Sequence, residues 1–302
     1  NPRYEATILN TRIRKNFINN KIKIYSLGDI GDQTYPYENI GDNSEIIKKI
    51  VQNENPISKK IVEAQNPLII LGQSALKLRS SKYIFESLKK FLRDNGKITN
   101  EWNSLNILSN NASTVGGYDL NIPINTQENK VLNELNRNAF KLVFLFGQDN
   151  LNFGKKNEFV IYIGSHGDKG AEIADIILPS AAFTEQDGYF TNLEGRVQKA
   201  YKASYPPGNA KEDWEIINEI SSLIKRKKLY QNKDELIDSM KNYLNLNKKD
   251  IKDEIIIEDF INETITIEPI DYYYSNVVAR SSYTMSLCRN EKLKIKKTGT
   301  EG

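Results

Sequence analysis

Five short apolar runs recur along the sequence, each about the length of a β-strand and most of them followed by a stretch with helical periodicity. Four runs end in glycine and the fifth ends in proline; they cover residues 23–28, 67–72, 141–147, 159–164 and 175–179. Their nearly continuous apolar character indicates strands that are covered on both faces, which is typical of a parallel sheet flanked by helices. The sequence therefore predicts an α/β fold with doubly wound, mostly parallel sheets.

Helical periodicity follows several of these runs. Apolar residues recur at helical spacing in residues 44–52, 81–93 and 212–227, which we interpret as crossover helices. In the third segment we expect a buried apolar stripe, followed by a lysine-rich end that suits the negative end of the helix dipole. The members of that stripe are Trp214, Ile216, Ile217, Ile220, Leu223 and Ile224.

The 302 residues suffice for one large domain or two ordinary domains with a real core. We expect the α/β module to occupy residues 1–248, and two subdomains, if present, to divide near residue 140. Within the module, residues 188–203 alternate around a glycine turn, which predicts an antiparallel hairpin or arm. Residues 249–302 turn first acidic and then basic, and we expect an extended tail over another surface rather than a third domain.

Composition excludes several classes of function. The sequence has one cysteine, Cys288, and one histidine, His166, so disulfides, cysteine-ligated iron–sulfur clusters, structural zinc sites and CxxC redox pairs are excluded within it. The formal net charge is only +3, with no face-sized basic block ahead of the tail, so nucleic acid is not indicated. The apolar runs are far shorter than the roughly 20 residues that cross a bilayer.

The glycines that end the apolar runs lie where an open α/β sheet places its ligands, outside the carboxyl ends of the strands. The phosphate-binding fingerprint GxGxxG is missing from all of them, and residues 28–31 and 72–75 come nearest to it. Because glycine is the default residue for a positive φ at a strand end, we interpret these loops as plain tight turns.

Residues 165–168 place the only imidazole, that of His166, in a glycine loop after a strand. A lone histidine without carboxylate and nucleophile partners rarely performs acid–base work. We therefore interpret His166 as a loop histidine that bonds a backbone carbonyl or a neighbouring chain. Cys288 has no partner in the sequence, and we interpret it as a half-buried thiol without redox function.

A charged cluster surrounds the glycine turn of the predicted hairpin; it consists of Glu185, Asp187, Glu194 and Arg196. A carboxylate pair for acid–base catalysis is one interpretation. We prefer a charged turn in which Asn192 and Gly195 tolerate left-handed backbone and Arg196 bridges a carboxylate or a carbonyl. On the residues alone, this is a soluble α/β protein with no visible catalytic centre.

Residues 174–198, ADIILPSAAFTEQDGYFTNLEGRVQ, resemble a segment of the molybdopterin oxidoreductase superfamily. Within that superfamily the chain most resembles the large iron–sulfur subunit of respiratory complex I, of the mitochondrial type. Further blocks carry this resemblance in the same order along the chain: residues 1–5 with 10–15, residues 206–208 with 211–214, and residues 279–285.

The resemblance implies the non-cluster-binding scaffold portion of that subunit. This portion supports electron transfer from NADH to ubiquinone, coupled to proton pumping, without being catalytic on its own. In the family the iron–sulfur clusters are bound by cysteine and histidine motifs of an N-terminal region, and none of those motifs occurs here, so we expect no cofactor in this chain. Structural or interface roles are implied for Asn192, Glu194, Gly195, Arg196, Gln198, Arg3, Arg12 and Arg14.

The resemblance also implies partners and a location. We expect the cluster-bearing N-terminal portion of the subunit as a separate chain, which supplies a parallel strand beside residues 22–27. Other subunits of the peripheral arm are further expected partners, on the matrix side of the mitochondrial inner membrane. Two alternatives stay open: the cofactor-holding part of a formate dehydrogenase-like molybdopterin enzyme, and a freestanding nucleotide-binding module that uses the Gly28 or Gly72 loop.

The small number of side chains that could bind a metal leads to a first prediction. The purified chain should carry no bound iron, molybdenum or nicotinamide cofactor, because it has one thiolate, one imidazole and no pyrophosphate fingerprint. Elemental analysis of the separated chain, together with an extraction assay for nucleotides, measures this directly. Stoichiometric metal on the separated chain would overturn it.

Overall fold

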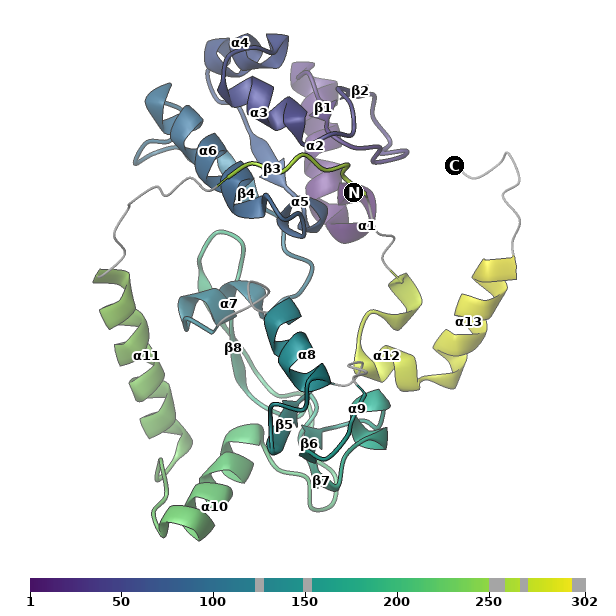
Figure 1. Cartoon of the computed structure of the whole chain (residues 1–302), viewed down its shortest axis with the longest axis vertical. Helices are drawn as coiled ribbons and strands as arrows, with labels where there is room; N and C mark the ends of the chain where they lie inside the picture. Colours follow the sequence, from purple (N-terminus) through teal and green to yellow (C-terminus); the bar gives the residue numbers. More distant parts are fainter. Residues whose placement is uncertain (123–127, 149–153, 250–258, 267–270, 295–302) are drawn as a thin grey trace. The chain divides into compact units, whose positions relative to one another are not determined.

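The structure is a computed structural model that describes residues 1–122, 128–148, 154–249, 259–266 and 271–294. These residues form two compact units (Figure 1). The first unit comprises residues 1–111 with 259–266, and the second comprises the described residues from 112 to 249 with 271–294. The second unit begins at residue 112, and helices α7 (Thr114–Asp119) and α8 (Glu128–Asn136) pack with its strands.

The first unit contains two short parallel strand pairs. Strand β1 (Tyr25–Ser26) pairs with β2 (Glu38–Asn39), and β3 (Ile69–Leu71) pairs with β4 (Leu105–Ile107). Its helices are α1 (Pro2–Glu5), α2 (Thr7–Asn20), α3 (Glu45–Val51), α4 (Pro56–Glu63), α5 (Gln73–Leu76) and α6 (Ser81–Asp94). The strands predicted at 23–28 and 67–72 are thereby confirmed, as are the helices predicted at 44–52 and 81–93.

The core of the first unit lies between α3, α4, α6 and the strand pair β3–β4. Helix α6 contributes most to it, through Ile84, Leu88, Phe91 and Leu92. These residues lie at positions i, i+4, i+7 and i+8, so they form one apolar stripe of the helix. Residue Leu92 is fully buried.

The second unit is built on a three-stranded parallel sheet in the order β5–β6–β7. Its strands are β5 (Leu142–Phe146), β6 (Phe159–Gly164) and β7 (Ile176–Pro179). Helices α8 (Glu128–Asn136) and α9 (Lys169–Glu172) cover one face, where the core residues are Leu135, Leu145, Val160 and Tyr162. The predicted α/β architecture with mostly parallel sheets is confirmed.

The other face of this sheet is largely uncovered by described residues. Register places Leu142 beside Phe159 and Phe144 beside Ile161, and Ile161 lies beside Ile176 of the next strand, so their side chains share one face. The exposed members of this face are Leu142, Phe144, Phe146, Phe159 and Ile176, whereas Ile163 at the carboxyl end is buried. We call these five exposed residues the open sheet face.

The predicted antiparallel hairpin is also confirmed. Strand β8 (Gly188–Thr191) pairs antiparallel with β9 (Val197–Ala200). The buried Thr191 anchors the hairpin on helix α7 (Thr114–Asp119), because its Oγ1 donates a hydrogen bond to Asp119 Oδ2 at 3.1 Å.

Helix α10 (Asp213–Lys225) confirms the helix predicted at 212–227, and α11 (Lys233–Lys249) follows it. A capping box between Glu212 and Glu215 fixes the start of α10. The expected burial of its whole apolar stripe is wrong: Ile216 is buried, but Leu223 and Ile224 are 83% and 75% exposed. The buried residues of α10, Ile216 and Asn218, both lie in its first half.

The tail divides between the two units. Residues 259–266 lie along the first unit, where Thr264 bridges antiparallel to Asn43 and the Phe260 ring packs 5.1 Å from the Tyr83 ring. Residues 271–294 belong to the second unit and are mainly helical rather than extended, with η1 (Tyr272–Tyr274), α12 (Val277–Ser281) and α13 (Tyr283–Lys294). Parts of the expected acidic stretch (250–271) and of the expected basic end (Lys292, Lys294, Lys296 and Lys297) lie outside the described residues, at 250–258, 267–270 and 295–302.

The core of the first unit leads to a stability prediction. Leu92→Ala should lower the free energy of unfolding by about 2–5 kcal/mol, because it removes fully buried methyl groups and leaves a cavity. Leu68→Ala is the matched control, since Leu68 is an exposed leucine of the same unit and should change stability by less than about 0.5 kcal/mol. Urea unfolding followed by circular dichroism measures both, and equal effects would contradict this location of the core.

Candidate functional site

The loop after β1 carries a buried network of amides that joins it to the N-terminal helices. The Gln33 side chain is fully buried; its Nε2 donates to Asn1 Oδ1 at 2.9 Å, and its Oε1 accepts from the backbone N–H of Arg3 at 3.2 Å. The buried Asn10 of α2 donates through Nδ2 to the Gln33 carbonyl at 3.1 Å. The N-terminal block that carries the resemblance is therefore a structural element that closes this loop.

The same loop uses its own backbone donors. The N–H of Gly28 donates to the Gly41 carbonyl at 2.6 Å, and the N–H of Gly31 donates to Asp29 Oδ1 at 2.9 Å. The N–H of Thr34 donates to Asp32 Oδ1 at 2.8 Å, and this bond, together with the ion pair to Arg3, lowers the pKa of Asp32 despite some desolvation. Three N–H groups that could face a phosphate are thus occupied, two of them by carboxylates that would repel it.

Of the predicted arginines in the N-terminal block, Arg3 pairs with Asp32, whereas Arg12 and Arg14 are exposed on α2. No described residue forms an ion pair with either Arg12 or Arg14. Among the described residues of α2, only Asn10 is buried. The structure therefore does not bring these three arginines to one site.

The hairpin turn holds the other predicted site residues. Asn192 Oδ1 accepts from the backbone N–H groups of Glu194 at 3.0 Å and Arg196 at 2.9 Å, and Gly195 has φ +79°, the left-handed region that favours glycine. The side chains of Glu194, Arg196 and Gln198 are exposed. The bridge expected from Arg196 to a carboxylate or carbonyl is not formed with any described residue.

The carboxylates at the base of the hairpin have structural partners. Glu185 accepts from the Ala182 N–H at 2.9 Å, and Asp187 accepts from the Lys202 N–H at 2.8 Å. The hydrogen bond from Lys202, followed by the charges of Lys199 and other lysines, lowers the pKa of Asp187 despite some desolvation. An ionised carboxylate held by a backbone donor does not serve as a general acid at neutral pH.

The carboxyl end of β6 holds the histidine loop. Ser165 Oγ and His166 Nδ1 lie 2.9 Å apart, and Tyr162 Oη donates to the His166 carbonyl at 2.6 Å. The nearby carboxylate of Asp168 is engaged elsewhere, because it caps α9 and accepts from Arg280 Nε at 2.7 Å. Among the described residues, His166 therefore gains a hydroxyl neighbour but no carboxylate that would complete a catalytic triad.

The contact between Asp168 and Arg280 links two segments that the sequence singled out separately. Arg280 lies on α12, inside the block at 279–285, and reaches the loop after β6. Partial burial raises the pKa of Asp168, but the hydrogen bonds from Arg280 and from the Lys169 N–H outweigh it and lower the pKa overall. Cys288 is exposed on α13, so the expectation of a half-buried thiol is wrong.

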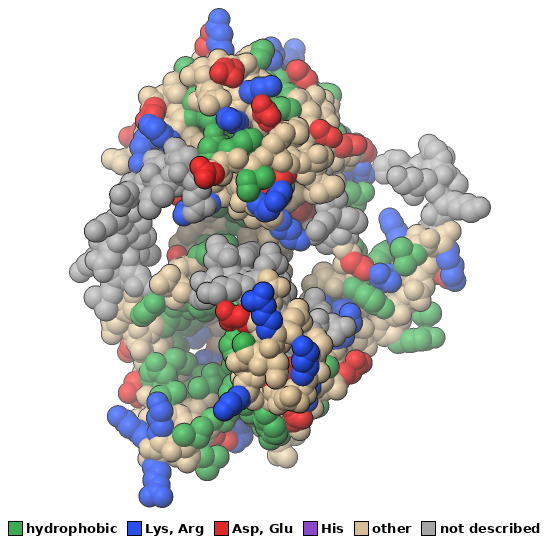
Figure 2. Space-filling model, viewed as in Figure 1, with side chains coloured by type: hydrophobic (Ala, Val, Ile, Leu, Met, Phe, Trp, Pro, Cys, Tyr) green, Lys and Arg blue, Asp and Glu red, His purple; other side chains and the backbone are tan. Residues whose placement is uncertain are grey.

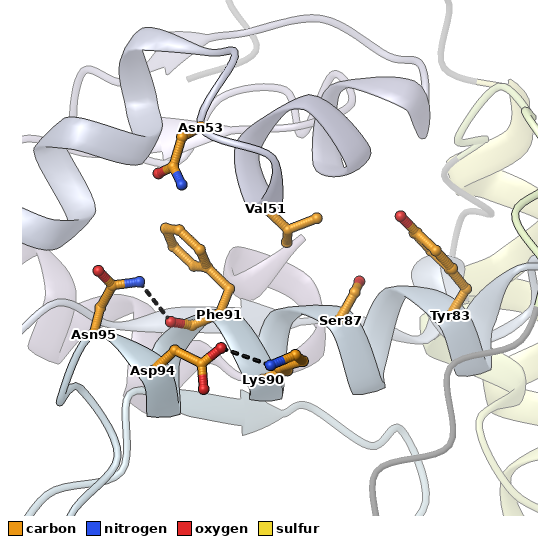
Figure 3. A pocket seen from close by; sticks show the side chains of 8 residues that line it. All are labelled: Val51, Asn53, Tyr83, Ser87, Lys90, Phe91, Asp94 and Asn95. Carbon is orange, nitrogen blue, oxygen red and sulfur yellow. Dashed lines mark hydrogen bonds and ion pairs between the residues drawn. The ribbon is translucent and has the colours of Figure 1, made fainter.

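A shallow cavity of about 320 Å³ lies in the first unit between the end of α3 and the face of α6 (Figure 3). Phe91 and Val51 form its apolar part, and the ion pair of Lys90 with Asp94, at 2.8 Å, lies on its rim. Burial raises the pKa of the Tyr83 phenol, so that group stays protonated at neutral pH. The carboxylate of Asp94 is engaged by Lys90, and no described histidine or cysteine lines the cavity.

Comparison with known proteins decides the family. The model of a family described as molybdopterin oxidoreductase matches residues 1–223. The chain belongs to the molybdopterin oxidoreductase family. The resemblance expected from residues 174–198 is thereby confirmed.

Curated relatives of this family member narrow the match. The NADH-ubiquinone oxidoreductase 75 kDa subunit of Reclinomonas americana is 35% identical over 301 residues, covering 95% of this chain and 43% of the relative. An NADH-quinone oxidoreductase subunit of Rickettsia bellii is 34% identical, with 99% and 44% covered, and the mitochondrial NADH-ubiquinone oxidoreductase 78 kDa subunit of Neurospora crassa is 33% identical, with 97% and 41% covered. The chain spans less than half the length of these relatives.

The family name implies a molybdopterin cofactor, and the loop after β1 does not fit its phosphate. A phosphorylated pterin at the loop after β1 would meet the carboxylates of Asp29 and Asp32, while the N–H groups beside them are already bonded. Clusters of three or more His, Cys, Asp or Glu side chains that could hold a metal are absent from the described residues. The backbone N–H groups of Gly28, Gly31 and Thr34 in this loop therefore already donate to acceptors of the chain itself.

The Asp168–Arg280 pair gives a pH prediction. Because the pKa of Asp168 is lower in the folded than in the unfolded chain, the pair should stabilise α12 fully above the unfolded value of about 3.9, and this contribution should fall as pH drops through the folded pKa. A double-mutant cycle of Asp168→Asn with Arg280→Gln should give a coupling of about 1 kcal/mol near pH 6 and less near pH 3.

The exposed pair Lys294–Glu291 on α13 is the matched control for this cycle, and its coupling should stay below about 0.5 kcal/mol. Unfolding by urea at each pH measures all the variants. A coupling at Asp168–Arg280 that does not change with pH would show that the carboxylate charge does not hold α12.

Proposed function

We propose that this chain is a structural module of NADH:quinone oxidoreductase, respiratory complex I. In this role it supports the cluster-bearing region of the large iron–sulfur subunit, through which electrons pass from NADH towards ubiquinone, and it performs no chemistry of its own. The family membership and the names of the relatives motivate the proposal. The open sheet face is the structural observation that carries it.

The open sheet face presents five large apolar side chains to water within one parallel sheet. Parallel sheets are normally covered on both faces, and contiguous exposed apolar patches of this kind are typical of contact surfaces. The Phe144 and Phe146 rings stack with centroids 6.0 Å apart, so they already form one continuous apolar area. A neighbouring subunit that covers this area would complete the second unit.

The polar groups of the chain support a non-catalytic role. Asp32, Asp168 and Asp187 all have lowered pKa values and accept hydrogen bonds from the chain itself. Catalytic acids and bases instead have pKa values near the working pH. We infer that the chain holds no cofactor and that the clusters lie on its partners.

Partners and location follow from the same proposal. We propose that the cluster-bearing portion of the subunit, expected as a separate chain, adds a strand beside β1, whose described pairing is with β2. Other peripheral-arm subunits contact the open sheet face. The location proposed is the matrix side of the mitochondrial inner membrane, and no helix within the described ranges is long and apolar enough to span a membrane.

A second candidate function is the cofactor-holding part of a molybdopterin-dependent, formate dehydrogenase-like oxidoreductase. The match to the molybdopterin oxidoreductase model favours it. The bonded donors and the carboxylates in the loop after β1 disfavour it. Stoichiometric molybdenum or tungsten with an extractable pterin in the purified protein would decide for this alternative.

Isolation of the native assembly tests the proposal. An affinity-tagged chain should migrate on native gels with NADH:quinone oxidoreductase activity, and mass spectrometry of that band should identify complex I subunits. The same spectra show which polypeptide carries the cluster-binding cysteines and whether it is separate from this chain. Recovery of the tagged chain only as a free monomer would refute the proposal.

The hairpin supplies a mutational prediction. Arg196→Ala should lower the abundance of the assembled complex several-fold while leaving NADH:quinone activity per assembled complex within about twofold. The reason is that an exposed arginine without an ion-pair partner among the described residues is suited to bidentate contacts with a neighbour. Arg137→Ala is the control, since Arg137 is an exposed arginine of the same unit outside the hairpin. Normal abundance with collapsed activity would assign Arg196 a chemical role.

A further inference from the structure

The end of α10 combines exposed aliphatic side chains with a run of cations. Leu223 and Ile224 are 83% and 75% exposed, and Leu229 in the following loop is also exposed. Between them lie four consecutive exposed cations: Lys225, Arg226, Lys227 and Lys228. We call these seven residues the α10 surface, and green and blue side chains gather over α10 at the lower left of Figure 2.

The cations of the α10 surface are not neutralised within the described chain. No described residue forms an ion pair with any of the four, although Lys225 and Arg226 stand at the helix C-terminus, where the dipole favours positive charge. The acids of α10 lie in its first half and are engaged: Asp213 with Ser180, Glu215 in the capping box and Glu219 with Lys211. No carboxylate of the described residues therefore neutralises the cations at this end of the helix.

A buried amide holds the α10 surface in shape. Asn218 Oδ1 accepts from the N–H groups of Leu229 at 2.7 Å and Tyr230 at 3.1 Å, and its Nδ2 donates to the Tyr230 carbonyl at 2.7 Å. Ser221 Oγ adds a hydrogen bond to the Lys227 carbonyl at 3.1 Å. The loop that carries Lys227, Lys228 and Leu229 is thereby fixed against α10, and a preformed surface loses less entropy on binding.

We propose that the α10 surface docks an acidic surface of another protein subunit, with Leu223 and Ile224 inserted into an apolar recess and the four cations facing carboxylates. This inference rests on the proposed function, which places the chain in a multisubunit assembly. Charge complementarity selects the occupant, because only an anionic partner relieves four adjacent positive charges. Two copies of this chain, meeting symmetrically here, would oppose like charges.

A protein partner fits the distribution of charge better than an anionic membrane does. A helix that lies on a bilayer has apolar residues along its whole length and cations on its flanks. Helix α10 instead carries Asp213, Glu215 and Glu219 in its first half, which a negative lipid surface would repel. The contact is therefore restricted to the last turn and the loop, an area suited to a recess in a protein.

Photo-crosslinking in the intact native assembly tests the proposal. With a benzoylphenylalanine at position 223, we expect an adduct to another subunit whose crosslinked peptide is rich in Asp and Glu. The adduct yield should fall as salt rises, since the screening length is only about 10 Å at 0.1 M. Position 293 is the matched control, because Leu293 is 69% exposed and lies between Lys292 and Lys294 at the end of another helix.

Variants separate the roles of the residues. Lys225→Glu, Lys227→Glu and Lys228→Glu together should lower the yield at position 223 about tenfold, and reversing the charge of the crosslinked acids should restore it. Lys292→Glu with Lys294→Glu should leave the yield unchanged. Asn218→Ala should lower the yield less than the triple variant, because it loosens the loop but keeps the charges.

Each outcome bears on one proposal. If the chain migrates with the NADH-oxidising complex but position 223 gives no adduct, a lipid adduct or an adduct to a second copy, the docking inference fails and the proposed function stands. If position 223 forms the acidic, salt-sensitive adduct in an assembly that lacks NADH:quinone activity, the proposed function fails and the docking inference stands.

Discussion

Parallel strands made of uninterrupted apolar residues require cover on both faces, and in the second unit the described residues cover only one. Helices α8 and α9 cover Leu145, Val160 and Tyr162, while the opposite side chains of β5 and Phe159 at the start of β6 are exposed. Each buried aliphatic or aromatic side chain contributes roughly 1.5–3 kcal/mol to stability, so leaving five exposed forgoes a large part of what the sheet could gain. Cover by a neighbouring subunit, as proposed above, would supply this missing burial.

In the first unit, residues of the chain itself cover the apolar strands, and the loop after β1 is held by internal hydrogen bonds. Its core is covered by α3, α4 and α6, and the carboxyl end of β1 is closed by the amides of Asn1, Asn10 and Gln33. Open α/β sheets usually bind ligands at that edge. Here the N–H groups of Gly28, Gly31 and Thr34 are bonded to the chain's own carbonyl and carboxylate groups.

Sequence patterns predicted those parts of the fold that rest on local periodicity. Strands β3, β5, β6 and β7 could be predicted because each lies in a continuous apolar run, whereas β2 (Glu38–Asn39) is too short and too polar for any period to be visible. Helix α12 escaped prediction because its main local signal is the single cap formed by Asn276. Periodicity also located the apolar stripe of α10, but it does not reveal whether the same chain covers that stripe, and the described residues leave its second half exposed.

The candidate sites were predictable only where the residues in contact are close in sequence. The hairpin turn follows from local backbone chemistry: Gly195 has the expected left-handed backbone, whereas Asn192 does not and contributes through its side-chain oxygen, which accepts two backbone N–H groups. Gln33 could not be found, because its partners lie at the N-terminus and become neighbours only through the fold. The segments that contain Asp168 and Arg280 were both recognised. The contact between them could not be predicted, because residues more than a hundred positions apart form no local sequence pattern.

Two kinds of unsatisfied surface thus coexist on one chain, and salt acts on them in opposite directions. The open sheet face is apolar, and its burial strengthens as excluded salts raise the cost of exposing apolar area. The cations of the α10 surface, and Arg12 and Arg14 on α2, depend on partner charges that salt screens. A net charge of only +3 conceals this arrangement, because the 42 basic residues are nearly balanced by 39 acidic ones over the whole sequence. In the assembly proposed above, apolar cover would hold the module in place, while the charged surfaces would determine which neighbour it meets and in which orientation.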